Sequence, residues 1–114
     1  MQMFRNLFGG GQYDIQSTEA QARLQSAQAP YVLDVRTPGE YRQGHIDGSV
    51  LIPLDELNHR IQEVPADREI LVVCRSGARS GIATSQLRAA GYSAFNLSGG
   101  IGSWMRHGLP MSRK

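Results

Sequence analysis

The sequence predicts one α/β domain, with a central parallel sheet of about five strands and helices on both faces. Short apolar runs rich in β-branched residues alternate with segments whose apolar residues recur at helical spacing. Short links join these segments, so right-handed crossovers should make the strands mostly parallel and cover both sides of the sheet. A chain of 114 residues has room for one compact core and little more.

The composition excludes several classes of protein. An apolar fraction of 40% and a charged fraction of 19% argue against disorder, and a net charge of +2 is too small to indicate nucleic acid binding. A single cysteine excludes an internal disulfide and a cysteine-clustered zinc site, and it fits a reducing compartment. No segment approaches the roughly 20 apolar residues of a membrane span. We therefore expect a cytoplasmic protein with no membrane or nucleic acid partner.

The first half of the chain contains the first two predicted strands. We expect a flexible N-terminal leader at residues 1–11, without the apolar core of a secretory signal, and the folded domain at residues 12–114. Tyr13–Gln16 is a possible short strand, and Ser17 is a suitable N-cap for a helix that ends before Pro30. Tyr31–Val35 is mostly apolar and is predicted to be the second strand.

The middle of the chain contains a strong helix-start signal. Thr37 is followed by Pro38 and then by Glu40, which together form a capping box with proline at the first helical position. Gly44 should end this short helix. Ser49–Ile52 is the third predicted strand, and apolar residues at helical spacing predict another helix over residues 54–64.

The last third begins with the most buried strand. Ile70–Val73 is an unbroken apolar run, as expected of a strand covered on both faces. A helix follows from Ser80 to Gly91, then a strand at Ser93–Leu97 and a short closing helix at Ile101–Arg106. The residues predicted to form the inward stripe of the helix are Ile82, Ala83, Leu87 and Ala90.

The loop Cys74–Arg79 joins the central strand to its helix and contains the only cysteine. Loops at the carboxyl edge of a parallel sheet bind ligands, and their N–H groups together with the helix start form a cradle for an anion. We expect Cys74 at the rim of that cradle, where the N–H groups, Arg75 and Arg79 lower its pKa and make it a nucleophile toward sulfur or phosphorus. Gly77 should allow the turn. Alternatively, Cys74 is an inert buried residue and the arginines are solvated.

Four motifs in order resemble the single-domain rhodanese family of sulfurtransferases over about residues 13–110. They are Asp34-Val35-Arg36, Glu40-Tyr41 with Gly44–Ser49, Cys74–Ser80, and Gly99-Gly100-Ile101 with Trp104, Gly108 and Pro110.

The resemblance implies a cofactor-free, ping-pong transfer of sulfane sulfur through a Cys74 persulfide. The donor would be a small anion such as thiosulfate, and the acceptor would be cyanide, a thiol or a sulfur-accepting protein. The persulfide would be held by the backbone N–H groups of the loop, while Asp34 would orient the loop by pairing with an arginine. The binding residues implied after Cys74 are Arg75, Ser76, Gly77, Ala78 and Arg79.

Two departures from the family pattern leave alternatives open. Two-domain thiosulfate enzymes have cations near the positions of Glu40 and Ser76, so thiosulfate is expected to be a poor substrate here. A non-catalytic or sulfur-carrier module that delivers sulfur to a partner is one alternative. A phosphatase-like enzyme of the same fold is the second, although only four residues separate Cys74 from Arg79 and related phosphatases have five.

Other polar residues have structural explanations. Asp34 can reach the loop or form an Asx turn, and Arg36 is expected to support the pocket through an ion pair with Glu40. His45 is expected to be a hydrogen-bonded structural residue, and Trp104 a core residue. Three scattered histidines do not predict a metal site.

Overall fold

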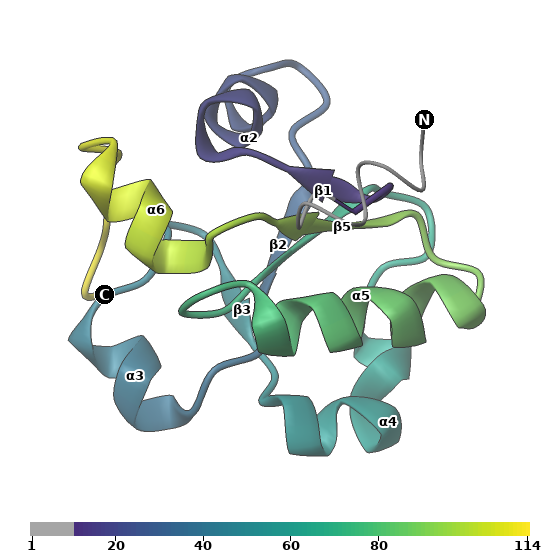
Figure 1. Ribbon diagram of the computed structural model, residues 1–114. Helices are drawn as coiled ribbons and strands as arrows, with labels where there is room; N and C mark the ends of the chain where they lie inside the picture. Colours follow the sequence, from purple (N-terminus) through teal and green to yellow (C-terminus); the bar gives the residue numbers. More distant parts are fainter. Residues whose placement is uncertain (1–10) are drawn as a thin grey trace.

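The computed structural model describes residues 11–114 and contains the predicted five-stranded parallel sheet, with strand order β1-β5-β4-β2-β3 (Figure 1). The fold class predicted from the sequence is therefore confirmed. Apart from Gly11, the predicted leader lies outside the described residues. The strands are β1 (Asp14–Ile15), β2 (Tyr31–Asp34), β3 (Val50–Leu51), β4 (Ile70–Val73) and β5 (Ala94–Leu97).

Helices cover both faces of the sheet: α2 and α6 lie on one side, and α4 and α5 on the other (Figure 1). The single helix predicted over residues 54–64 is wrong, because α4 is one short turn between the 3₁₀ turns η1 and η2. Asp55, Asn58 and His59, which are weak helix formers, lie within that stretch. The helical segments are α2 (Ser17–Leu24), α3 (Pro38–Gln43), η1 (Leu54–Glu56), α4 (Leu57–Arg60), η2 (Ile61–Glu63), α5 (Ala78–Ala89) and α6 (Gly100–Arg106).

The central strand β4 separates two apolar clusters. Ile70 and Val72 pack with residues of α4 and α5, whereas Leu71 and Val73 pack with residues of α2 and α6. All four side chains are buried. Successive side chains of a strand point to opposite faces of the sheet, and both faces are covered here, so every residue of β4 is apolar. A strand with one exposed face would alternate apolar and polar residues.

The inward face of α5 differs from the predicted stripe. Ile82 is 54% exposed and Ala90 is also exposed, so both assignments were wrong. Two polar residues point inward instead, because their hydroxyl groups find hydrogen-bond partners: Ser80 bonds within the site, and Thr84 Oγ1 donates to the Ser80 carbonyl oxygen at 2.7 Å. The buried residues of α5 are Ser80, Ala83, Thr84 and Leu87.

Three segments meet where β2 and β4 end. Asp34 pairs with Val73 in the parallel register, so the turns that follow β2 and β4 leave the same edge of the sheet. The first turn leads to α3, which begins with the predicted capping box at Thr37 and ends at Gly44. The second is the cysteine loop, and α6 packs against it through backbone hydrogen bonds.

Within residues 11–114, no helix has the length and apolar character needed to cross a bilayer.

Candidate active site

The cysteine loop turns at Gly77, whose φ of 101° lies in the left-handed region that favours glycine. A Cβ there would lie 3.3 Å from the Gly99 amide nitrogen, so the tight space as well as the backbone angle favours glycine. In this conformation the Gly77 N–H donates to Cys74 Sγ at 3.1 Å. Gly77 therefore directs a backbone donor at the sulfur, as the sequence predicted for the loop.

Cys74 is not at an open rim, as expected from the sequence, but beneath the loop. The residue is 1% exposed, while Arg75 and Ser76 above it are exposed. The loop folds over the sulfur because its amides turn inward to bond it. Burial raises the pKa of the Cys74 thiol, but hydrogen bonds from the Ser80 hydroxyl and from the N–H groups of Ser80, Gly77 and Ser76 outweigh burial and leave the pKa below its ordinary value. A cysteine in purely apolar surroundings would have a raised pKa.

Hydrogen-bond donors are the main causes that lower this pKa, although Arg79 also interacts with the Cys74 charge. Arg79 turns away to Glu40, with Nη1 and Nη2 at 2.8 and 2.9 Å from the carboxylate oxygens. This two-point pair lowers the pKa of Glu40 to about 2 and raises that of Arg79. Arg75 is exposed and lines two cavities beside the loop.

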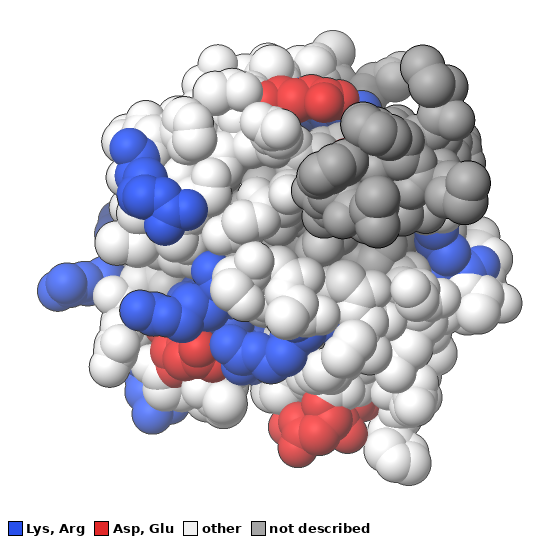
Figure 2. Space-filling model, in the orientation of Figure 1, with Lys and Arg blue, Asp and Glu red and all other residues white. Residues whose placement is uncertain are grey.

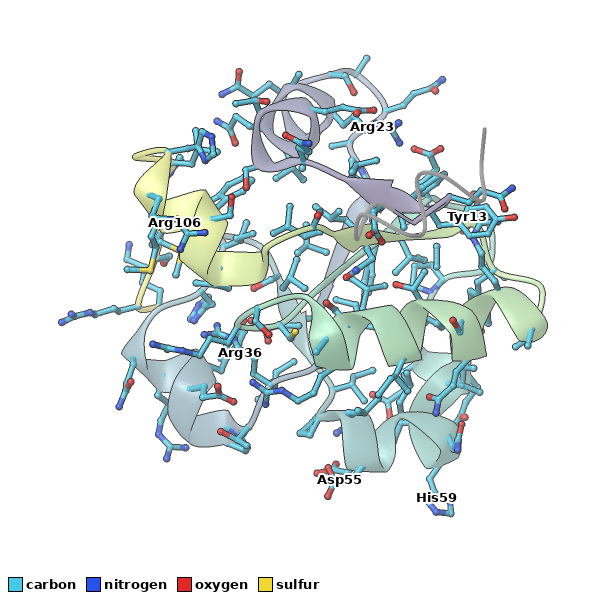
Figure 3. The ribbon with its side chains drawn as sticks, viewed as in Figure 1. Tyr13, Arg23, Arg36, Asp55, His59 and Arg106 are labelled. Atoms are coloured by element: carbon cyan, nitrogen blue, oxygen red, sulfur yellow. The ribbon has the colours of Figure 1, made fainter. Side chains whose placement is uncertain are left out.

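Asp34 and Arg36 bond to each other beside the loop. Arg36 donates through Nε and Nη2 to both Asp34 carboxylate oxygens, at 3.1 and 2.7 Å to Oδ2, and its backbone N–H donates to Oδ1 at 3.0 Å. Figure 3 labels Arg36 between α3 and the loop before α5. Asp34 thus pairs with an arginine, as the resemblance implied, and that arginine is Arg36. The expected Arg36–Glu40 pair is wrong, because Glu40 pairs with Arg79. The Asx-type bond exists, and adjacency along the chain makes Arg36 the nearer cation for Asp34.

The start of α6 holds the outer side of the loop. Ile101 N–H donates to the Cys74 carbonyl oxygen at 2.9 Å, and Gly102 N–H donates to the Arg75 carbonyl oxygen at 3.0 Å. Gly100 has a φ of +61°, and a Cβ there would lie 2.5 Å from the Arg75 carbonyl group. Because these hydrogen bonds hold the loop carbonyl groups toward α6, the loop N–H groups can face the sulfur. The Gly99-Gly100-Ile101 motif thus has a direct part in the site.

Two polar residues beneath the sulfur were not predicted as site residues. Ser80 Oγ lies 3.2 Å from Cys74 Sγ and 2.5 Å from Asn96 Oδ1. Asn96 is a polar residue within the strand Ala94–Leu97, and it is buried. A polar side chain in the middle of a buried strand was the available signal, because such a group requires a hydrogen-bond partner inside the protein.

A cavity of about 430 Å³ opens beside the loop. Arg36, Arg75 and Arg113 contribute positive charge to its wall, while Ile101 and Met105 contribute apolar surface. Glu40 also lines the cavity, and its charge is paired with that of Arg79. Figure 2 shows basic side chains, with acidic atoms among them, on the half of this face where α3 and α6 lie in Figure 1. The surroundings of the loop therefore suit an anionic ligand.

The remaining polar residues are structural or exposed. His45 is buried and stacks on Tyr41, and its two ring nitrogens lie 2.7 and 3.0 Å from the carbonyl oxygens of Tyr41 and Lys114, which confirms its predicted structural role. Trp104 is 1% exposed and is a core residue, as predicted. Figure 3 shows His59 at the outer side of α4. Among residues 11–114, no group of three or more His, Cys, Asp or Glu could hold a metal ion.

Comparison with known proteins gives consistent matches over most of the chain. The family model described as a rhodanese-like domain matches residues 16–107. A protein named sulfurtransferase from Allochromatium vinosum is 40% identical over 99 residues, which cover 86% of this chain and 92% of the relative. Thiosulfate sulfurtransferase 18 from Arabidopsis thaliana is 35% identical over 111 residues, an alignment that covers 83% of this chain and 79% of that protein. Among solved structures, a rhodanese-related protein from Thermoplasma volcanium has a TM-score of 0.84 at 32% identity, covering 89% of this chain and 98% of that one.

Proposed function

Because the chain belongs to the rhodanese-like domain family, we propose that it is a sulfurtransferase in which Cys74 carries sulfane sulfur as a persulfide. The observation that carries this proposal is the environment of the sulfur. Cys74 Sγ lies at the start of α5 and accepts hydrogen bonds from the Gly77 N–H and the Ser80 hydroxyl. These donors stabilise a thiolate in a buried position, which an inert structural cysteine does not need.

The first half of the reaction loads the enzyme. The Cys74 thiolate attacks the outer sulfur of a donor such as thiosulfate, a new S–S bond forms, and the old S–S bond breaks. Sulfite leaves with the electron pair of the broken bond. The negative charge then lies on the outer sulfur of the persulfide, where inward-facing loop amides would stabilise it. The donor anion would approach past Arg75, whose side chain lines the neighbouring cavities.

The second half returns the enzyme to its starting state. A thiophilic acceptor, which is cyanide in an assay and a thiol or a protein cysteine in a cell, attacks the outer sulfur. The persulfide S–S bond breaks, and its electron pair returns to Cys74 Sγ as the thiolate. No electrons are gained or lost overall, so the reaction as proposed needs no cofactor.

The pairing of Glu40 with Arg79 favours donors other than thiosulfate. Both terminal guanidinium nitrogens of Arg79 are bound to Glu40 at 2.8 and 2.9 Å, so this cation is less available to bind the donor anion. A persulfide on another protein needs less positive charge at the site. A sulfur-carrier role, in which Cys74 receives sulfur from a protein and delivers it to another, is therefore the second candidate.

The same pairing disfavours phosphoryl transfer. In that chemistry the arginine at the end of the loop binds the transferred phosphoryl group, and here Glu40 occupies Arg79. The sequence argument agrees, since only four residues separate Cys74 from Arg79. Cleavage of an aryl phosphate above background, lost in Cys74→Ser, would contradict this ordering.

The intact mass of the protein after incubation with thiosulfate tests the proposal. We expect a gain of one sulfur atom, its removal by cyanide with release of thiocyanate, and no gain in Cys74→Ser. Rapid loading from a protein persulfide with negligible turnover on thiosulfate would favour the carrier. Failure to load from either donor would refute both candidates.

A further inference from the structure

Cys74 Sγ and Asn96 Oδ1 compete for one hydrogen-bond donor, the hydroxyl group of Ser80. Ser80 Oγ lies 3.2 Å from Cys74 Sγ and 2.5 Å from Asn96 Oδ1. A serine hydroxyl has one proton to donate, so it can serve only one of these acceptors at a time. Ser80 is 0% exposed and Asn96 is 6% exposed, so an acceptor that loses this donor is poorly placed to replace it with bulk water.

The contacts of the Asn96 amide fix which of its atoms faces Ser80. Nδ2 lies 3.1 Å from Asp14 Oδ1 and 3.2 Å from the Gly77 carbonyl oxygen. An ionised carboxylate and a carbonyl group only accept hydrogen bonds, so the amide NH₂ must face them. Asn96 Oδ1 therefore faces Ser80 as an acceptor. The same amide also braces Gly77, whose N–H donates to the sulfur.

On the premise that Cys74 is the sulfur-transferring residue, we propose that Asn96 is a positioning residue that sets how strongly the Ser80 hydroxyl binds the Cys74 sulfur. In the thiol state, the S–H donates to Ser80 Oγ and the Ser80 hydroxyl donates to Asn96 Oδ1. Each group then has a partner. When the thiol proton leaves for solvent, the Ser80 hydroxyl rotates to donate to the sulfur, and Asn96 Oδ1 loses its donor.

The arrangement has a consequence for the persulfide. In that state the negative charge lies on the outer sulfur, so Sγ becomes a weaker acceptor and the Ser80 hydroxyl returns to Asn96. Asn96 Oδ1 thus competes with Cys74 Sγ for the Ser80 hydroxyl only when Cys74 is a free thiolate. The free thiolate is bound less tightly than it would be by Ser80 alone, which leaves it more reactive toward the sulfur donor.

Charged groups on the surrounding elements are the same in all the variants proposed below. Arg79 of α5 interacts with the Cys74 charge and is paired with Glu40 of α3. Asp14 of β1 contacts the Asn96 amide. On β2 and the turn after it, Asp34 is paired with Arg36. A difference between variants in the titration of Cys74 therefore reports on the hydroxyl and the amide.

A double-mutant cycle tests the proposal on the whole chain, with the ultraviolet absorbance of the thiolate followed against pH. Ser80→Ala should raise the thiol pKa by about one unit, which is a tenfold change in the acid dissociation constant, because a donor to the charged sulfur is lost. Asn96→Leu should lower the thiol pKa, because the hydroxyl then has the sulfur as its one acceptor. In the Ser80→Ala background, Asn96→Leu should have no further effect.

An equal effect of Asn96→Leu in both backgrounds, or a raised pKa in the single variant, would overturn the proposal. Such a result would mean that Asn96 acts only by bracing Gly77. The titration uses no sulfur donor, so it stands apart from failure of the proposed sulfurtransferase activity.

A second measurement on the unmodified chain guards against a variant that fails to fold. The side-chain carbonyl ¹³C resonance of Asn96 should move with the same midpoint as the thiol, and this movement should disappear in Ser80→Ala. A resonance that stays fixed through the thiol titration would refute the switching of the hydroxyl.

Discussion

Replacing Glu40 by glutamine releases Arg79, and two separate measurements should detect the release. The fall in the Glu40 pKa from 4.5 to about 2 corresponds to about 3 kcal/mol at face value. Arg79 is 36% exposed and Glu40 25% exposed, so solvent screening reduces the effect, and exposed pairs contribute about 1 kcal/mol. We expect Glu40→Gln to lower the free energy of unfolding by about 1 kcal/mol at neutral pH, measured by urea denaturation.

The pH dependence identifies the carboxylate as the cause. The folded-state pKa of Glu40 is below its ordinary value, so the stabilisation is complete above about pH 4.5 and is lost as the pH falls toward 2. The difference between wild type and Glu40→Gln should therefore shrink over that interval. Glu19→Gln, which removes an exposed pair with Arg23, is the matched control and should change stability by less than about 0.5 kcal/mol.

The released Arg79 should also bind the donor anion. We expect KM for thiosulfate to fall several-fold in Glu40→Gln, with little change in the Glu19→Gln control. A stability difference that does not depend on pH would refute the electrostatic account. An unchanged KM would refute the inference that Glu40 keeps Arg79 from the donor.

Three further changes test other parts of the site. Gly100→Ala should cost about 1–3 kcal/mol in thermal unfolding and slow sulfur loading, because an alanine at φ +61° is strained and its Cβ meets the Arg75 carbonyl group; a wild-type melting curve would refute this. Trp104→Phe should cost about 2 kcal/mol in urea unfolding, since the ring is buried and Nε1 donates to the Pro110 carbonyl oxygen; an unchanged midpoint would contradict that role. Alkylation of Cys74 by iodoacetamide should reach its maximal rate at lower pH than that of an unfolded control, and a midpoint at or above 9.0 would show that burial outweighs the donors.

The loop was predictable because its signals are local. A buried strand, a glycine with left-handed φ and a helix start follow each other within residues 70–80, so the sequence placed Cys74 among backbone donors. The capping box of α3 was predictable for the same reason. In each case, the residues that decide the outcome are neighbours along the chain or have strong conformational preferences.

The depth of Cys74 and the polar face of α5 were not predictable from those patterns. The sequence predicted Cys74 at the rim of the anion cradle and Ile82 on the inward face, yet Cys74 is buried and Ile82 is 54% exposed. Apolar spacing cannot reveal that Ser80 points inward, because its burial depends on an acceptor 16 positions away on β5. The backbone of the loop determined how far the sulfur lies below the surface.

The sequence by itself determined the parallel sheet, the position of the nucleophile and the glycine turn that directs amides toward it. Only the tertiary structure decided which charged and polar groups are partners: Glu40 binds Arg79, Arg36 binds Asp34, and Asn96 binds Ser80. The physical reason is that backbone preferences act within a few residues, whereas an ion pair or a buried hydrogen bond depends on distances set by the packing of the whole domain.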